Sequence, residues 1–358
     1  MRFIFKTDYA QDIRLVRHGG QCLWYGLLLA AMLAAPWWAG DYGLSQLNFV
    51  LVYAIAGLGL MVLSGYTGLA SIGHAAFLGV GAYAEAWCAA RGWPFPLSMA
   101  LAAALSAAVG VVVGLPALRV KGIYLAIATL AMGIIVEEIL ARWESVTGGN
   151  AGVSVKPLQF PGLDLANSTA LFYVALLLCV LVTLGVLNLL RSATGRAFIA
   201  IRDSEISAQS MGIHLAHYKT LAFALSAAIV GLAGTLYAHQ LRFISPDQFG
   251  ILQSIDLLLL VVVGGLGSVH GAFLGAMFLI AMPQLIAVGK DFLPPAIGQS
   301  SGLQAVVYGA VLMAFVLFEP MGLYGRWLKV RTWLELFPFY RRGMFKRQKA
   351  YARSERLK

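Results

Sequence analysis

The chain has 358 residues, of which 60% are hydrophobic and 12% charged, with a mean hydropathy of +0.79 and a formal net charge of +10. Soluble globular domains carry about 25% charged residues, so this composition excludes an ordinary soluble protein. A transmembrane β-barrel would show short segments of alternating polarity instead of the long apolar runs found here. We therefore predict an all-α fold, a polytopic membrane helix bundle.

Ten apolar runs approach the length of about 20 residues that a helix needs to cross the hydrocarbon core. The third and the eighth are short, which leaves tilted, broken or re-entrant segments open at those places. In chain order, the predicted spans are residues 22–40, 47–64, 75–90, 97–118, 123–141, 169–190, 219–240, 254–267, 270–288 and 303–318.

Basic residues set the expected orientation. An even number of spans places both termini on one side, and 21 of the 26 Lys and Arg residues fall on that side. Because positive residues are retained in the cytoplasm, both termini and the 191–219 loop are predicted to be cytoplasmic. The chain then divides into a cytoplasmic N-terminal segment (1–21), a transmembrane domain (22–320) and a basic cytoplasmic tail (321–358).

The two ends of the chain have simple interpretations. The tail after Arg326 could bind nucleic acid or anionic lipid, and its position beside a span favours membrane lipid, so no nucleic-acid partner is predicted. Asp8 and Asp12 precede the first apolar run, which is long enough to remain as an anchor. We therefore expect no cleavable signal peptide.

A glycine-rich passage, residues 64–83, follows the second span. Glycines at this density permit close helix approach, whereas irregular backbone at membrane depth survives only where protein or water satisfies it. The passage therefore either lines a translocation pathway or forms a tightly packed turn. The candidate pathway residues are Ser71, Gly73, His74 and Phe77, and the pathway interpretation is favoured for Ser71 and His74.

A polar stretch within residues 195–212 interrupts the apolar segments. Asp203 or Ser204 can cap a helix start, and Glu205 suits the first turn of that helix. Gly212 suits the left-handed position just past a helix end. The helix so defined has about two turns and would be marginal alone in water, so we expect a partner protein to hold it.

A second glycine-rich passage, residues 264–276, echoes the first. In both, Gly-Leu-x-Ser precedes a His close to Ala-Phe-Leu-Gly. Gly265, Gly267 and Ser268 are pathway candidates on the same grounds, with tight helix packing as the equal alternative. The echo is short and only suggests a duplicated half.

Four acidic residues fall within spans, where such groups are costly and usually functional. Glu137 and Glu138 are expected beside Arg142 at the outer end of their span, and Asp256 is expected to begin its span near the outer face. The fourth is Glu85.

Other reactive groups favour no enzyme. Cys22, Cys88 and Cys179 lie in apolar spans without metal-ligand spacing, so we expect buried structural thiols and no metal site. Residues 298–302 match G-x-S-x-G but lack a strand–turn–helix context. No nucleotide-binding motif occurs, so the chain is predicted to be a non-enzyme with no cofactor of its own.

Four motifs together resemble one family, the M-type permease subunits of bacterial high-affinity branched-chain amino acid transporters of the ATP-binding-cassette (ABC) class. The resemblance spans roughly residues 53–318, and the C-terminal tail is longer than the family pattern. The motifs are Gly68–Tyr83, Thr147–Gly152, Gly195–Arg202 with Gly212, and Val263–Ser268.

This resemblance implies an importer in the bacterial inner membrane. The chain would pair with a second, homologous permease, and a periplasmic binding protein would deliver a branched-chain amino acid. Two cytoplasmic ATPases would bind ATP and Mg and drive alternating access. The coupling motif is a partial match, because the Glu-Ala-Ala of other importers reads Glu-Ile-Ser-Ala here.

The resemblance also implies three groups of functional residues. Those for coupling to an ATPase are Arg196, Arg202, Asp203, Ser204, Glu205, Ala208 and Gly212. Those for the translocation pathway are Ser71, Gly73, His74, Phe77, Gly265, Gly267 and Ser268. Those for docking of the binding protein are Thr147, Gly148, Gly149 and Asn150.

Alternatives stay open. The same scaffold carries related cargo such as urea, short amides or aromatic acids. A secondary transporter would need coupling-ion carboxylates near the bilayer midplane, for which the chain has few candidates, and it would leave the capped cytoplasmic helix unexplained.

Overall fold

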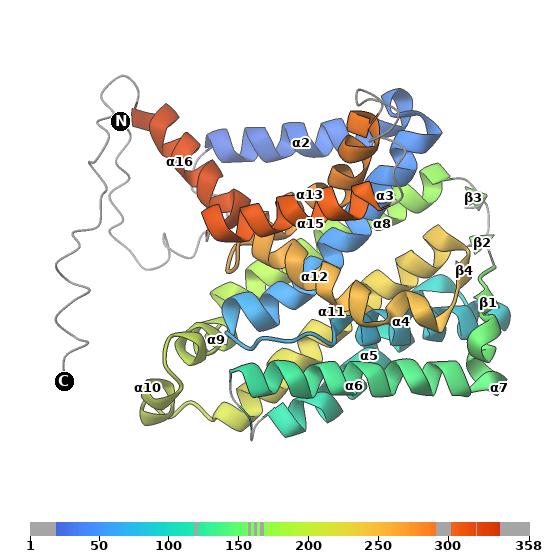
Figure 1. The fold of residues 1–358 in the computed structure, drawn as a ribbon, viewed down its shortest axis with the longest axis horizontal. Coiled ribbons are helices and arrows are strands. Elements are labelled where there is room, and N and C mark those ends of the chain that lie inside the picture. The colour runs from blue at the N-terminus through green and yellow to red at the C-terminus, as the bar shows by residue number, and fades with distance from the viewer. Residues whose placement is uncertain are drawn as a thin grey trace.

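The computed structural model describes residues 19–117, 120, 122–156, 159–160, 163–164, 168–290, 302–319 and 321–336. Within them the chain is almost entirely helical (Figure 1), which confirms the predicted all-α class. The main helices are α2 (Gly19–Trp38), α3 (Gly40–Leu60), α4 (His74–Ala90), α5 (Phe95–Ala117), α6 (Ile123–Arg142), α8 (Ser168–Arg191), α9 (Ala193–Asp203), α10 (Glu205–Ser210), α11 (Leu215–Leu241), α12 (Ile251–Gly264), α13 (Val269–Lys290), α15 (Leu303–Phe318) and α16 (Gly322–Leu336).

Each of the ten predicted apolar segments overlaps one helix of the structure. Seven helical segments in the described residues are long and apolar enough to cross a membrane, and they are built on α3, α5, α6, α8, α11, α12 and α13. The other three predicted segments correspond to α2, α4 and α15, which fall short of that length or hydropathy. The chain is thus a multi-pass membrane protein.

Helix α11 is the centre of the bundle, with α3, α4 and α5 packed around it. Helices α8, α12 and α13 flank α3, and α6 lies on α4 and α5. Helix α2 packs on α3 and α8, and its leucine and tryptophan side chains are largely exposed. Because apolar side chains on a membrane helix can face lipid tails, α2 fits the periphery of the bundle.

Glycines allow the central helices to approach each other closely. A Cβ placed on Gly81 of α4 would overlap the backbone of Gly231 on α11, and one on Gly234 would overlap the Leu78 carbonyl. Helices α12 and α13 make a similar contact at Gly264. Small residues at such crossings are the usual means of membrane helix packing, so these glycines are explained by packing.

The two ends of the bundle differ in structure. At one end, right in Figure 1, lie the short helices α7 (Glu144–Thr147) and η2 (Gly149–Ala151) and two antiparallel strand pairs. The strands are β1 (Val153–Ser154) with β4 (Phe243–Ile244), and β2 (Gln159–Phe160) with β3 (Leu163–Asp164). At the opposite end, left in Figure 1, lie α9 and α10.

Several expectations need correction. The 191–219 loop contains a second helix, α9, that was not predicted. The basic tail begins as helix α16, which packs on α12 and α13, while residues 337–358 lie outside the described residues. The expected buried thiol at Cys22 is wrong, because Cys22 is exposed on peripheral α2.

Helix α16 is joined to the bundle by a carboxylate at the α15–α16 turn. Arg326 Nε donates to Glu319 Oε1 over 2.6 Å, and Lys329 Nζ lies 3.7 Å from Glu319 Oε2. The hydrogen bond from Arg326, with the nearby positive charges, lowers the pKa of Glu319. The pair ties the start of the tail to the end of the last apolar helix.

The outer-loop G-x-S-x-G match and most of the N-terminal segment lie outside the described residues.

Candidate functional site

The polar loop forms two helices joined by a sharp bend at Ser204. Ser192 caps α9 by accepting from the Gly195 amide over 3.3 Å, and the extended backbone of Ser204 ends that helix. The Ser204 hydroxyl then accepts from the Ser207 amide over 3.3 Å and caps α10. Gly212 follows α10 with φ +83°, as predicted from its place in the sequence. The predicted short helix is therefore confirmed, with Ser204 and not Asp203 as its cap.

A buried ion pair ties α10 to the central helix. Lys219 Nζ of α11 lies 2.7 Å from Glu205 Oε1, with side-chain exposures of 3% and 23%. Charged side chains are seldom buried unless they are paired. The sequence predicted Glu205 as a first-turn acid and, by the family resemblance, as a coupling residue, but its partner fourteen residues later had no local signal.

Two large apolar side chains are exposed at α10, among the exposed polar residues Ser207, Gln209 and Ser210. Ile206 is 77% exposed and Met211, just past the helix, is 83% exposed. Ala208, which was expected to allow a partner to approach, is 2% exposed and packs against this chain. Ile206 and Met211 are thus candidate contact residues that the motif comparison missed; their signal was two large apolar residues in a polar loop.

Arg202 links the polar loop to both glycine-rich passages. Its Nη1 donates to the Gly65 carbonyl over 3.3 Å. A Cβ on Gly68 would lie 2.9 Å from Arg202 Cγ, and one on Gly267 would lie 3.4 Å from Nη1. Arg202 also pairs with the exposed carboxylate of Asp203 over 3.1 Å. The side chain therefore spans the turn between the loop and the helix breaks, while Arg196 stays at the loop and donates to the Arg191 carbonyl.

The two helix breaks, about 200 residues apart in sequence, lie against each other. The first begins as a π-helical turn, η1 (Met61–Tyr66), and Met61 Sδ accepts from the Gly267 amide over 3.1 Å. The second break needs glycine, because φ is +117° at Gly265 and +80° at Gly267. Ser268 bonds the Gly265 carbonyl and accepts from the Gly271 amide, so it organises the start of α13.

A chain of buried hydrogen bonds runs through the first break. Ser71 Oγ and His74 Nδ1 are 2.8 Å apart, and His74 Nε2 and Ser226 Oγ are 2.8 Å apart. Ser226 donates its one proton to the Gly59 carbonyl over 2.7 Å. In the neutral imidazole, Nε2 therefore carries the proton given to Ser226, and Nδ1 accepts from Ser71. His74 is thus fully hydrogen-bonded between α3, α4 and α11.

Helices α6 and α12 secure the same turn. The Ile72 amide donates to Thr129 Oγ1 of α6 over 3.1 Å, and the Ala75 amide donates to Ser254 Oγ of α12 over 3.1 Å. Gly73 contacts the Thr129 carbonyl so closely that any side chain would overlap it. These long-range partners could not be read from the sequence of the turn.

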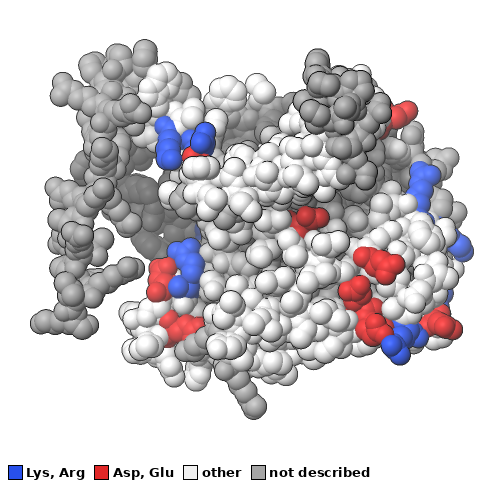
Figure 2. Space-filling model, viewed as in Figure 1, with Lys and Arg blue, Asp and Glu red and all other residues white. Residues whose placement is uncertain are grey.

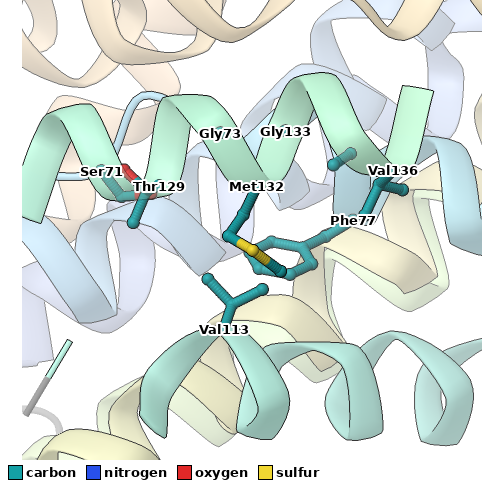
Figure 3. A pocket seen from close by; sticks show the side chains of 9 residues that line it. Ser71, Gly73, Phe77, Val113, Thr129, Met132, Gly133 and Val136 are labelled. Carbon is teal, nitrogen blue, oxygen red and sulfur yellow. The ribbon is translucent and has the colours of Figure 1, made fainter. Parts of the chain in front are cut away.

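Four members of the turn and of α4 line a narrow crevice between α4, α5 and α6 (Figure 3). In that figure Met132 and Val113 project toward the ring of Phe77. The crevice has no room for water or an amino acid in this conformation. Its lining residues are Ser71, Gly73, Ala76, Phe77, Val113, Thr129, Met132, Gly133 and Val136.

The residues of the Thr147–Asn150 motif are mostly buried or half-buried. The Thr147 hydroxyl donates to the carbonyls of Leu140 and Trp143 over 2.6 and 2.7 Å and is buried. Gly148 and Gly149 have left-handed backbone, with φ +67° and +60°. Of the four predicted docking residues, Asn150 alone is exposed. The other three shape the loop, and Asn150 leaves its polar side chain accessible.

Charges are arranged along the bundle axis. On the face in Figure 2, Lys and Arg side chains lie near the two ends, and a broad uncharged band with isolated acidic groups lies between them. Inside the bundle, Glu85 of α4 pairs with His239 of α11 over 3.0 Å, both nearly fully buried. This pair joins α4 and α11 a second time, towards the end of each helix that is farther from the His74 chain.

Comparison with known proteins is consistent with these features. The family described as branched-chain amino acid transport system / permease component matches residues 43–316. The high-affinity branched-chain amino acid transport system permease protein LivM of Salmonella typhimurium is 34% identical over 329 residues, which is 85% of this chain and 75% of that protein. The same protein of Escherichia coli is 32% identical over equal shares.

A more distant relative carries a different name. The autoinducer 2 import system permease protein LsrC of Enterobacter sp. is 27% identical over 206 residues, 55% of this chain and 58% of that protein. No solved structure matches the chain significantly.

Proposed function

The chain belongs to the family of branched-chain amino acid transport system permease components, and we propose that it moves branched-chain, hydrophobic amino acids across the bacterial inner membrane. It is the permease subunit of an ABC importer and not itself an enzyme. The proposed cargo rests on the sequence identity of 34% and 32% to two LivM permeases over 85% of the chain. The autoinducer 2 permease resembles a smaller part at lower identity.

The proposed assembly contains a second homologous permease, two cytoplasmic ATPases that bind ATP and Mg, and a periplasmic binding protein. In it, α10 docks on one ATPase through Ile206 and Met211. Their large apolar side chains are exposed in this chain and would be removed from water by such a contact. The binding protein docks at the outer end, with Asn150 among its contacts. Burying an isoleucine stabilises a contact by about 1.5–3 kcal/mol.

The proposed coupling route runs from α10 into the bundle. Glu205 transmits displacement of α10 to Lys219, and Ser226 lies seven residues further on the same face of α11. Ser226 holds His74 and Gly59, while Arg202 holds the break at Gly65. Movement of α10 would therefore shift both helix breaks together. Alternating access requires such a link between the ATPase contact and the breaks in the membrane helices.

The same route gives the pathway residues a role. In this conformation the turn at Ser71, Gly73, His74 and Phe77 is closed and packed. A change in the tilt of α11 would open the crevice beside Phe77 or part the contact between Gly65 and Gly267. The glycines, with Ser268 at the start of α13, provide close contacts that can slide without large side chains interlocking.

We further propose that all ten apolar segments cross the membrane, with both termini in the cytoplasm. The positive-inside bias supports this orientation. Helices α9 and α10 lie at the opposite end of the bundle from the β1–β4 pair, which supports successive segments that cross the membrane in alternating directions. The basic tail would then lie at the cytoplasmic lipid surface.

Cysteine accessibility tests this topology. In a background with the three native cysteines replaced, Ser154→Cys on β1 and Ser210→Cys on α10 are both at exposed positions. An impermeant maleimide should label Ser154→Cys in intact spheroplasts and Ser210→Cys only after permeabilisation. Labelling of both from outside would rule out the ten-span arrangement.

Docking and function can be tested together in the complete importer reconstituted in proteoliposomes. The wild type should take up leucine with ATP inside and binding protein outside. Ile206→Lys should reduce leucine-stimulated ATP hydrolysis about tenfold or more, because a buried apolar contact becomes a buried charge. Ile206→Met keeps an apolar contact and should retain most of the stimulation.

Two results would count against this proposal. If the wild-type complex takes up no branched-chain amino acid but does take up another solute, the cargo is wrong. If Ile206→Lys combined with Met211→Lys keeps full stimulation, α10 is not the docking element.

A further inference from the structure

Asp256 places a carboxylate well inside a membrane-crossing segment. That segment runs from Pro246 to Gly264, so Asp256 lies ten residues from its outer start and eight from its inner end. The expectation that Asp256 begins its span was wrong, because the helical segment starts earlier than the hydropathy indicated. Asp256 is the one charged residue of α12, and a charge at this depth is costly and usually functional.

No cation within the described part of the chain is paired with this carboxylate. Among the described residues, no Lys, Arg or His side chain forms an ion pair with Asp256. Its side chain is half-buried, so it is neither sealed in the core nor free at a surface. The site is thus a partly exposed negative charge with no cationic partner among the described residues.

Tyrosine side chains from three other helices lie near the carboxylate. Tyr53 of α3, Tyr237 of α11 and Tyr308 of α15 lie within electrostatic range of it. The Tyr53 and Tyr237 rings meet edge to face with centroids 6.3 Å apart. Gln253, one turn before Asp256, donates to the Tyr53 hydroxyl over 2.9 Å. A carboxylate beside tyrosine rings and an amide is the usual chemistry of a site for an organic cation.

A polar seam leads to this cluster from the outer end of α3. Tyr42 donates to Gln284 over 2.8 Å, and Gln240 donates to Ser45 over 2.9 Å. Tyr42, Ser45 and Tyr53 are spaced by three and eight residues, so they share one face of α3. These hydrogen bonds place hydroxyl and amide groups along the side of α3 that carries Tyr53.

We propose that Asp256, with Tyr53, Gln253 and Tyr308, binds the primary ammonium group of the transported zwitterion. This inference rests on the proposed amino-acid cargo. The ammonium would supply the positive charge that α12 lacks, and its departure would be the step that alternating access must drive. Solutes without an ammonium group, such as urea or aromatic acids, would leave the carboxylate unpaired and would be rejected at this point.

The test uses the complete reconstituted importer with its binding protein. Asp256→Asn keeps the side-chain shape and removes the charge, and it should lower leucine uptake about tenfold or more, as expected for loss of a charge-assisted hydrogen bond. Asp256→Glu should restore a large part of the uptake. The amount of assembled complex recovered should remain at the wild-type level for both variants. Asp41→Asn, which removes an exposed charge at the outer end of α3, is the matched control.

Each other outcome has a distinct meaning. Wild-type uptake of leucine with equal uptake by Asp256→Asn would overturn the ammonium site while leaving the proposed function intact. Loss of the assembled complex in both Asp256→Asn and Asp256→Glu would assign Asp256 a structural role and would also overturn it. Absence of leucine uptake by the wild type would instead refute the proposed cargo.

Discussion

Replacing Gly81 with valine is expected to leave little correctly folded protein in the membrane. A Cβ at Gly81 of α4 would overlap the backbone of Gly231 on α11, the helix at the centre of the bundle. Overpacking costs about 1–3 kcal/mol where neighbouring side chains can adjust. Here the obstacle is the backbone of a rigid helix, so we expect a cost at or above the top of that range.

The measurement is the amount of monodisperse protein extracted from membranes and its thermal stability in detergent. Gly185→Val is the matched control, since a Cβ added to Gly185 on α8 would meet no atom within 4 Å and the backbone there is ordinary helix. It should express and melt like the wild type. Equal yields of the two variants would show that α4 and α11 do not cross at these glycines.

The helices were predictable because lipid imposes a local rule. A membrane helix must be apolar over about 20 residues and must satisfy its own backbone, so hydropathy alone located all ten apolar helices. The ends were less predictable, as for α12, which the structure begins at Ile251 and extends outward through η3 (Pro246–Phe249). Polar residues such as Gln253 and Ser254 lowered the hydropathy near that start. Their hydrogen-bond partners lie on other helices, so the sequence did not show that these side chains are satisfied.

Helices α9 and α16 escaped prediction for a related reason. Helix α9 has a mixed sequence with apolar residues on one face, and only Ala197, Phe198 and Ile201, with Gly195, are buried. A membrane-span criterion rejects such a sequence, although an amphipathic pattern of this kind is typical of a helix lying on the bundle surface.

The residues of the candidate site also differ in how far they could be predicted from the sequence. Caps and turns depend on residues three or four positions apart, so the sequence narrowed the cap to Asp203 or Ser204 and assigned Gly212 to the turn. The partner of His74 Nε2, by contrast, is Ser226, more than 150 residues away, which itself donates to the Gly59 carbonyl, while the turn before His74 is held by Thr129. Such pairings depend on which helices are neighbours, and no local pattern encodes that.

Breaking the ion pair between Glu205 and Lys219 is expected to uncouple ATP hydrolysis from transport. Lys219→Met keeps the aliphatic stem and removes the charge, which leaves the Glu205 carboxylate without its cationic partner on α11. Removing one member of a buried pair typically costs about 3–5 kcal/mol. This pair joins α10 to α11 outside the main helix contacts. The lost free energy should therefore weaken the attachment of α10 to the bundle, while the bundle itself still inserts into the membrane.

The complete importer carrying Lys219→Met should therefore assemble, keep its basal ATP hydrolysis and lose most leucine-stimulated hydrolysis and uptake. Exchanging the charges with Glu205→Lys and Lys219→Glu together should restore part of both, because the attraction between the two sites returns. Asp203→Asn breaks only the exposed pair with Arg202, which is worth at most about 1 kcal/mol, and it should have little effect. If Lys219→Met responds to leucine like the wild type, movement of α10 reaches the helix breaks by another route, and the contact of Arg202 with the Gly65 carbonyl would become the connection to examine by Arg202→Met.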